Sequence, residues 1–119
     1  MNRELEMAKL ACRALDEKKG KDIKVIDIHE VSVIADYFVI ASASNQNQVQ
    51  AMVGNVDETL GRAGFEAKQI EGTRNSSWVL MDYGDMIVHV FDEENRLFYD
   101  LERIWRDGKV LDVNEFLEK

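Results

Sequence analysis

Hydrophobic positions along the chain recur at two spacings, which predict helices and strands in a definite order. Apolar residues at steps of three and four predict helices over residues 2–19, 45–63 and 92–106. Short apolar segments predict strands over residues 23–28, 36–43, 65–70, 78–83 and 86–91. The order α-β-β-α-β-β-β-α, without repeats or linkers, predicts a single domain over residues 1–119, of α/β (α+β) class. We expect one mixed five-stranded sheet flanked by helices, with residues 108–119 as a tail that docks or forms a final helical turn.

The last two predicted strands are expected to form a hairpin, and they carry large side chains on both faces. Trp78, Leu80 and Asp82 share one face of its first strand, and His89 lies among apolar residues in its second. Two alternatives follow: both faces are buried, or one face is an exposed patch that binds a partner. Aromatic side chains are common anchors of protein interfaces, and neighbouring acids favour a basic partner. The hairpin is therefore the candidate protein-binding site.

The charge balance limits the classes of partner. The chain has 15 Lys and Arg against 23 Asp and Glu, a formal net charge of −8. An acidic surface repels nucleic acid and anionic membranes, so we expect no binding to free nucleic acid and no membrane association. The one cysteine, Cys12, lies on the apolar stripe of the first helix and is expected to be a buried hydrophobic residue. Without a predicted targeting or membrane-spanning segment, we expect a cytoplasmic protein.

Motifs for enzymatic chemistry are largely missing. The sequence contains no glycine-rich phosphate-binding motif and no nucleophile elbow. His29 and His89 are too far apart in the sequence to suggest a metal site. Asp82 and Asp85 are the one carboxylate pair worth weighing, and they leave open a metal-dependent nucleotidyl- or phosphotransferase as the alternative. Their spacing across a turn does not direct both carboxylates to one face. We therefore expect no catalytic, cofactor-binding or metal site, and we expect that the protein is not an enzyme.

A polar segment over residues 42–48 joins the second predicted strand to the second helix. Ser44 or Asn45 is expected to cap the helix, and an anion-binding helix start is the alternative.

Several sequence blocks, in order, resemble the ribosomal silencing factor family, RsfS, also called Iojap-like. They are A-D-Y-F-V-I-A-S at residues 35–42, Asn45, Gln46, Gln48 and Val49, Glu71-Gly72, W-V-L-M-D-Y-G-D-M-I-V-H-V-F at residues 78–91, and R-L-F-Y-D-L-E-R-I-W at residues 96–105. The resemblance covers about residues 3–107. It departs from the family at Ala35, where many members have Thr, and at Ala43, where many have Gly.

The resemblance implies a role and a set of contact residues. Members of this family bind the large ribosomal subunit at its protein L-fourteen, block association with the small subunit and repress translation. They have a nucleotidyltransferase-like fold without known catalysis, and they tend to form homodimers. On this basis the residues expected to contact the ribosomal protein are Trp78, Leu80, Asp82, Tyr83, Asp85 and His89, followed by Arg96, Tyr99 and Glu102.

Overall fold

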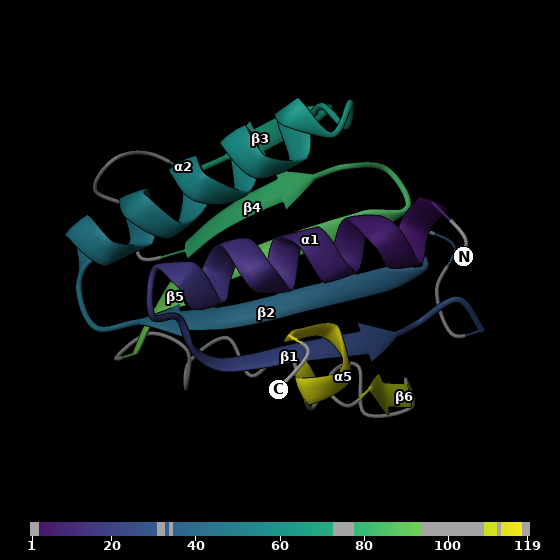
Figure 1. Cartoon of the computed structure of the whole chain (residues 1–119), viewed down its shortest axis with the longest axis horizontal. Coiled ribbons are helices and arrows are strands. Elements are labelled where there is room, and N and C mark those ends of the chain that lie inside the picture. The colour runs from purple at the N-terminus through teal and green to yellow at the C-terminus, as the bar shows by residue number, and fades with distance from the viewer. Residues whose placement is uncertain are drawn as a thin grey trace.

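The described helices and strands follow the predicted order, with one additional short strand near the carboxyl end. The computed structural model describes residues 3–30, 33, 35–72, 78–93, 109–111 and 113–117. Its elements are α1 (Arg3–Glu17), β1 (Lys21–Asp27), β2 (Tyr37–Ala43), α2 (Gln46–Arg62), β3 (Gln69–Glu71), β4 (Trp78–Asp82), β5 (Met86–Asp92), β6 (Lys109–Leu111) and α5 (Val113–Leu117) (Figure 1). The helix predicted over residues 92–106 lies outside the described residues, apart from its first two positions.

The strands form one mixed sheet in the order β3-β4-β5-β2-β1-β6. β2 pairs in parallel with β5, and every other neighbouring pair is antiparallel. The five predicted strands are all present, which confirms the fold class, and β2 lies inside the sheet as its two apolar faces indicated. The sixth strand, β6, was not predicted, because three residues are too few to show a period. It extends the sheet beyond β1, with Leu111 opposite Val25.

The third strand begins later than its apolar residues suggested. Phe65 lies outside β3 and instead closes the carboxyl end of α2, where its N–H donates to the carbonyl oxygen of Leu60 over 2.8 Å. Gly64 precedes it with a φ of 93°, the left-handed conformation common just after a helix. The phenyl ring is buried against the helix layer, so its hydrophobicity serves the helix end and not a strand.

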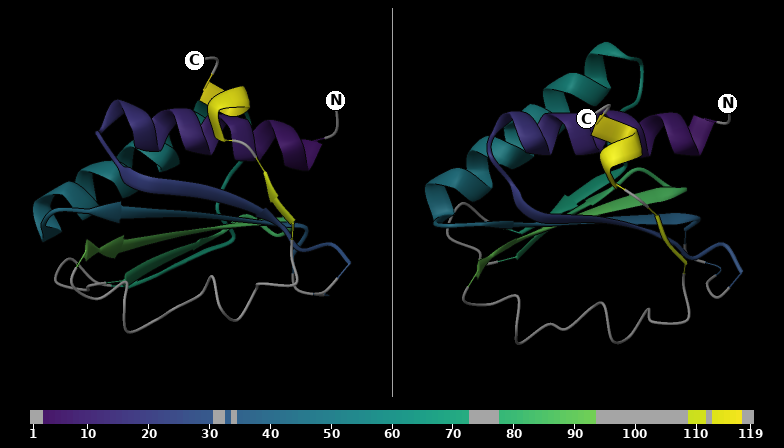
Figure 2. Two further views of the ribbon diagram at one scale, coloured as in Figure 1. Left: turned by 90° about the horizontal axis from the view of Figure 1, so that it is seen from below. Right: turned by 60° about the horizontal axis from the view of Figure 1, so that its bottom comes forward.

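Both long helices lie on the same face of the sheet, and α5 lies beside α1 on that side (Figure 2). The larger core fills the space between helices and sheet, and Cys12 is fully buried in it, as predicted. A smaller core lies on the opposite face of the sheet. Its buried members are Ile26, Ile28, Ala35, Phe38, Ile40, Ile87 and Phe91. None of the helices in the described part of the chain has the length and hydrophobicity of a membrane-spanning segment.

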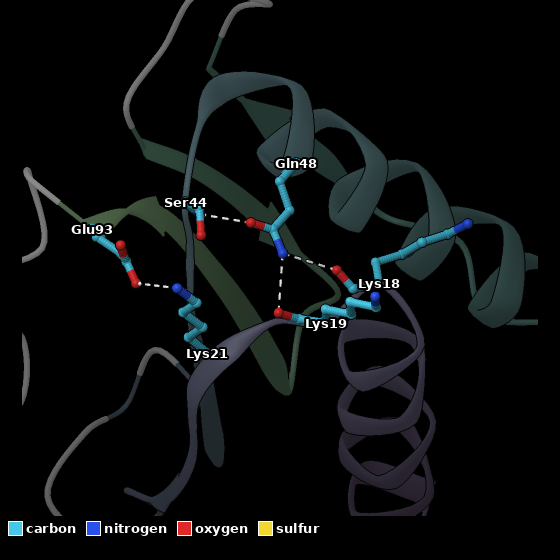
Figure 3. A network of polar contacts seen from close by, with 6 residues as sticks. All are labelled: Lys18, Lys19, Lys21, Ser44, Gln48 and Glu93. Atoms are coloured by element: carbon cyan, nitrogen blue, oxygen red, sulfur yellow. Dashed lines mark hydrogen bonds and ion pairs between the residues drawn. The ribbon is translucent and has the colours of Figure 1, made fainter.

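One glutamine joins the turn after α1 to the start of α2 (Figure 3). Gln48, in the first turn of α2, donates from Nε2 to the carbonyl oxygens of Lys18 and Lys19, each over 3.0 Å. Its Oε1 accepts from the N–H of Ser44 over 2.6 Å. Asn45 caps the helix as predicted, because its Oδ1 accepts from the Gln48 N–H over 2.8 Å. The polar segment before α2 therefore holds the α1–β1 turn against the β2–α2 junction.

Candidate protein-binding site

The candidate hairpin consists of β4 and β5, joined by a tight turn. Asp82 lies opposite Ile87, and its Oδ1 accepts from the Gly84 N–H over 2.8 Å. Gly84 has a φ of 89°, a conformation that glycine adopts without strain. The backbone oxygen of Asp85 accepts from the N–H groups of Asp36 and Tyr37 over 2.8 and 3.1 Å, which fastens the turn to the start of β2.

An aromatic cluster organises the hairpin face that points away from α1 and α2. Trp78 lies opposite Phe91 in the strand pair, with ring centroids 5.4 Å apart and planes inclined by 21°. The Trp78 and His89 rings are also stacked, with centroids 5.8 Å apart. Phe38 from β2 meets His89 edge-on at 4.7 Å. These contacts hold the Trp78 ring at a fixed orientation near the beginning of β4.

The indole and imidazole are also joined by a hydrogen bond. Nε1–H of Trp78 donates to Nδ1 of His89 over 3.1 Å. Because indole is a donor only, Nδ1 of His89 must be unprotonated. Burial lowers the pKa of His89 to about 4, so the imidazole is neutral at pH 7, with its proton on Nε2.

The predicted contact residues differ in exposure. Trp78, Leu80 and Asp82 are half-buried on one face of β4, and Asp85 is exposed in the turn. Tyr83 and His89 expose only 6% and 3% of their surface, so neither side chain is accessible to a partner in this conformation.

The reason for this burial differs between the two residues. Tyr83 belongs to the core beneath the helices, and His89 lies within the aromatic cluster. One face of the hairpin is thus buried beneath the helices, and on the other face the side chains of β4 remain partly exposed. Arg96, Tyr99 and Glu102 lie outside the described residues.

A small hollow beside Trp78 adds two residues that were not among the predicted contacts. It has a volume of about 100 Å³, and the described residues that line it are Glu71, Gly72, Trp78 and Leu80. Gly72 has a φ of 119°, and a Cβ there would lie 2.9 Å from the backbone oxygen of Trp78. A glycine is therefore needed for β3 to run so close to the start of β4. The adjacent Glu71-Gly72 in the sequence was the available signal for this site.

The face of the β3–β4 pair that borders the hollow carries carboxylates. Glu71 lies opposite Leu80, and Gln69 lies opposite Asp82, so these four side chains share one face of the β3–β4 pair. Glu71 and Asp85 are exposed and Asp82 is half-buried. A half-buried aromatic ring bordered by carboxylates is suited to basic protein surfaces.

The carboxylate pair of the enzymatic alternative is divided by the turn. Asp82 uses Oδ1 to hold the Gly84 N–H, and Asp85 lies in the turn itself. Within the described ranges, no group of three or more His, Cys, Asp or Glu side chains is arranged to hold a metal ion. The geometry therefore adds no observation in favour of a nucleotidyl- or phosphotransferase.

Comparison with known proteins gives one consistent family. A family model described as "Ribosomal silencing factor during starvation" matches residues 1–119. The ribosomal silencing factor RsfS of Bacillus subtilis is 37% identical over 106 residues, covering 89% of this chain and 90% of the relative. A crystal structure from Chromobacterium violaceum superposes with a TM-score of 0.84 at 35% identity, covering 88% of each chain. A more distant mouse relative, 30% identical over 94 residues, covers 76% of this chain and 41% of the relative; it is named "Mitochondrial assembly of ribosomal large subunit protein 1".

Proposed function

This chain belongs to the ribosomal silencing factor family, and on that premise we propose that it binds the large ribosomal subunit and keeps the small subunit from joining. The observation that carries the proposal is the family match over residues 1–119. The name of the mouse relative, which refers to the large ribosomal subunit, supports the choice of subunit. Occupying the joining surface of one subunit represses translation by steric competition, without any chemical step.

The proposed contact is the partly exposed face of β4 together with the turn that follows it. Trp78 and Leu80 supply apolar area, and Asp82 and Asp85 supply negative charge. Burial of a rigid aromatic ring slows dissociation, while complementary charge speeds encounter with a basic surface. The buried side chains of Tyr83 and His89 support this surface from within. The contacts proposed for Arg96, Tyr99 and Glu102 stay predictions.

The proposed partner is a basic ribosomal protein, and the family resemblance indicates L-fourteen. Ribosomal RNA is the less suitable surface for this site, because the carboxylates of the hairpin and of Glu71 would face phosphates. The homodimer that the resemblance implies, and a cytoplasmic location, remain predictions that follow from the same proposal.

Co-sedimentation with purified subunits tests the proposal. The chain is expected to pellet with large subunits and not with small subunits. Asp85→Lys places a positive charge in the turn without removing the backbone bonds made by residue 85, and it should weaken pelleting. Glu6→Lys makes the same charge change at an exposed position of α1, on the other side of the sheet, and should pellet like the wild type. A wild-type chain that pellets with neither subunit would refute the proposal.

A further inference from the structure

The described residues that line the hollow beside Trp78 are of three kinds. An indole ring and the Leu80 side chain form its apolar part, Glu71 supplies a carboxylate, and the Cβ-less Gly72 leaves space next to the β4 backbone. A volume of about 100 Å³ holds several water molecules or the end of one long side chain. The hollow is therefore sized for a single inserted group and not for a peptide segment.

The indole ring offers the occupant an apolar face and no hydrogen-bond donor. Its one N–H is already used in the bond to Nδ1 of His89, and its ring is stacked against Phe91. A fixed aromatic ring whose donor is engaged attracts cations through its electron-rich face, and a planar guanidinium stacks on it most favourably. Trp78 thus favours a long side chain with a cationic end over a polar acceptor.

The negative charge at the hollow also favours a cationic occupant. Glu71 accepts from Nε2 of Gln69 through Oε1 over 2.6 Å, which directs the carboxylate along the β3–β4 face. A carboxylate has acceptor positions on both oxygens, so Glu71 can pair with a cation while it keeps the Gln69 contact. Asp82, opposite Gln69 and on the same face of β4 as Leu80, adds a second negative charge to this face. An anionic group such as a phosphate would be repelled by both.

We infer that the hollow lined by Glu71, Gly72, Trp78 and Leu80 receives the cationic end of one arginine or lysine side chain of the ribosomal protein, with Glu71 as its counter-ion. This inference rests on the proposed function, and it gives the proposed contact surface a specificity-determining subsite. The aliphatic stem of the inserted side chain packs on Leu80 and on the Trp78 ring. Glu71 pairs with the charged end.

Binding to purified large subunits, measured over a series of salt concentrations, tests the subsite. Glu71→Gln keeps the size of the side chain and removes its charge. We expect it to weaken binding about tenfold, the usual effect of losing a charged hydrogen-bond partner at an interface. Its affinity should also depend less steeply on salt than that of the wild type, because one ion pair is missing. Glu6→Gln on α1 is the matched control and should leave both quantities unchanged.

The outcomes distinguish a failure of the proposed subsite from a failure of the proposed function. If Glu71→Gln binds as tightly as Glu6→Gln, or loses affinity with no change in salt dependence, the subsite is refuted while wild-type binding still supports the proposed function. If the wild type itself does not bind large subunits, the proposed function fails and the subsite fails with it. Because Glu71 is exposed, the variant is expected to fold, and equal thermal unfolding of the two variants checks this.

Discussion

The indole N–H of Trp78 and Nδ1 of His89 are joined across the β4–β5 pair by a hydrogen bond of 3.1 Å. The bond links a half-buried ring on β4 to a buried ring on β5. His89 thereby sets the orientation of the aromatic side chain that we propose as the anchor for the ribosome.

Removing the donor of this bond should destabilise the protein while keeping the aromatic stack. Trp78→Phe retains a ring against Phe91 but leaves Nδ1 of His89 without the indole N–H. A buried acceptor without its partner costs about 1–3 kcal/mol, so the free energy of unfolding should fall by that order. Urea denaturation measures it. An unchanged midpoint would mean that the hydrogen bond contributes nothing to folding.

Acid should destabilise the fold through His89. Burial lowers the pKa of His89 to about 4 in the folded state. In the unfolded chain the same imidazole binds a proton near pH 6.5. Stability is therefore complete above about pH 6.5 and falls as the pH decreases toward 4, by about 2 kcal/mol between pH 7 and pH 5 from this group. Urea denaturation at the two pH values measures the loss.

Two histidine variants identify the source of that pH dependence. His89→Phe keeps an aromatic ring in the cluster and should lose less stability between pH 7 and pH 5 than the wild type. His29 is exposed, and its hydrogen bond to Asp27 raises its pKa, which gives it the opposite dependence on pH. His29→Gln should therefore still lose stability between pH 7 and pH 5, as the wild type does. If His89→Phe loses as much stability, the assignment to His89 is wrong.

Two glycine-to-alanine substitutions should change stability in opposite directions. Gly72→Ala places a Cβ 2.9 Å from the Trp78 oxygen at a φ of 119°, and it should destabilise the fold by about 1–3 kcal/mol. Gly54→Ala, within α2, meets nothing within 4 Å and should stabilise it by about 0.5–1 kcal/mol. Thermal unfolding of both variants tests the pair. Equal shifts would contradict the close approach of β3 to β4.

Loss of the Gln48 side chain should affect stability without affecting the hairpin. Gln48→Ala removes bonds to the backbones of Lys18, Lys19 and Ser44, and it should cost about 1–3 kcal/mol. Asn47→Ala, at the preceding position, where the side chain is exposed, should cost much less. Both variants should bind large subunits normally under folding conditions. Weaker binding by Gln48→Ala alone would indicate that this brace influences the hairpin.

The sequence predicted the elements that have a clear period and missed those that do not. β2, α2 and the β4–β5 hairpin have enough apolar positions to define their type, and all were found. β6 is too short for such a signal. Phe65 was assigned to a strand because hydrophobicity alone does not separate a strand residue from one that closes a helix end.

The candidate site was predicted only in outline. Alternation correctly placed Trp78, Leu80 and Asp82 on one face, but it does not say which face neighbouring elements cover. The burial of Tyr83 and His89 depends on β2 and the helices, which are remote in the sequence. The hollow at Gly72 depends on a backbone angle that no residue pattern specifies.

Subunit joining is the measurement that tests the central claim most directly. Large subunits are incubated with the protein, small subunits are added, and light scattering follows the formation of joined ribosomes. The wild type and Glu6→Lys should reduce joining in proportion to their concentration, and Trp78→Ala combined with Asp82→Lys should not. Asp85→Lys leaves the Trp78–His89 bond in place and should also inhibit poorly. This variant provides the test if the double variant does not fold. Unchanged joining at saturating wild-type protein, or full inhibition by a folded double variant, would contradict the account.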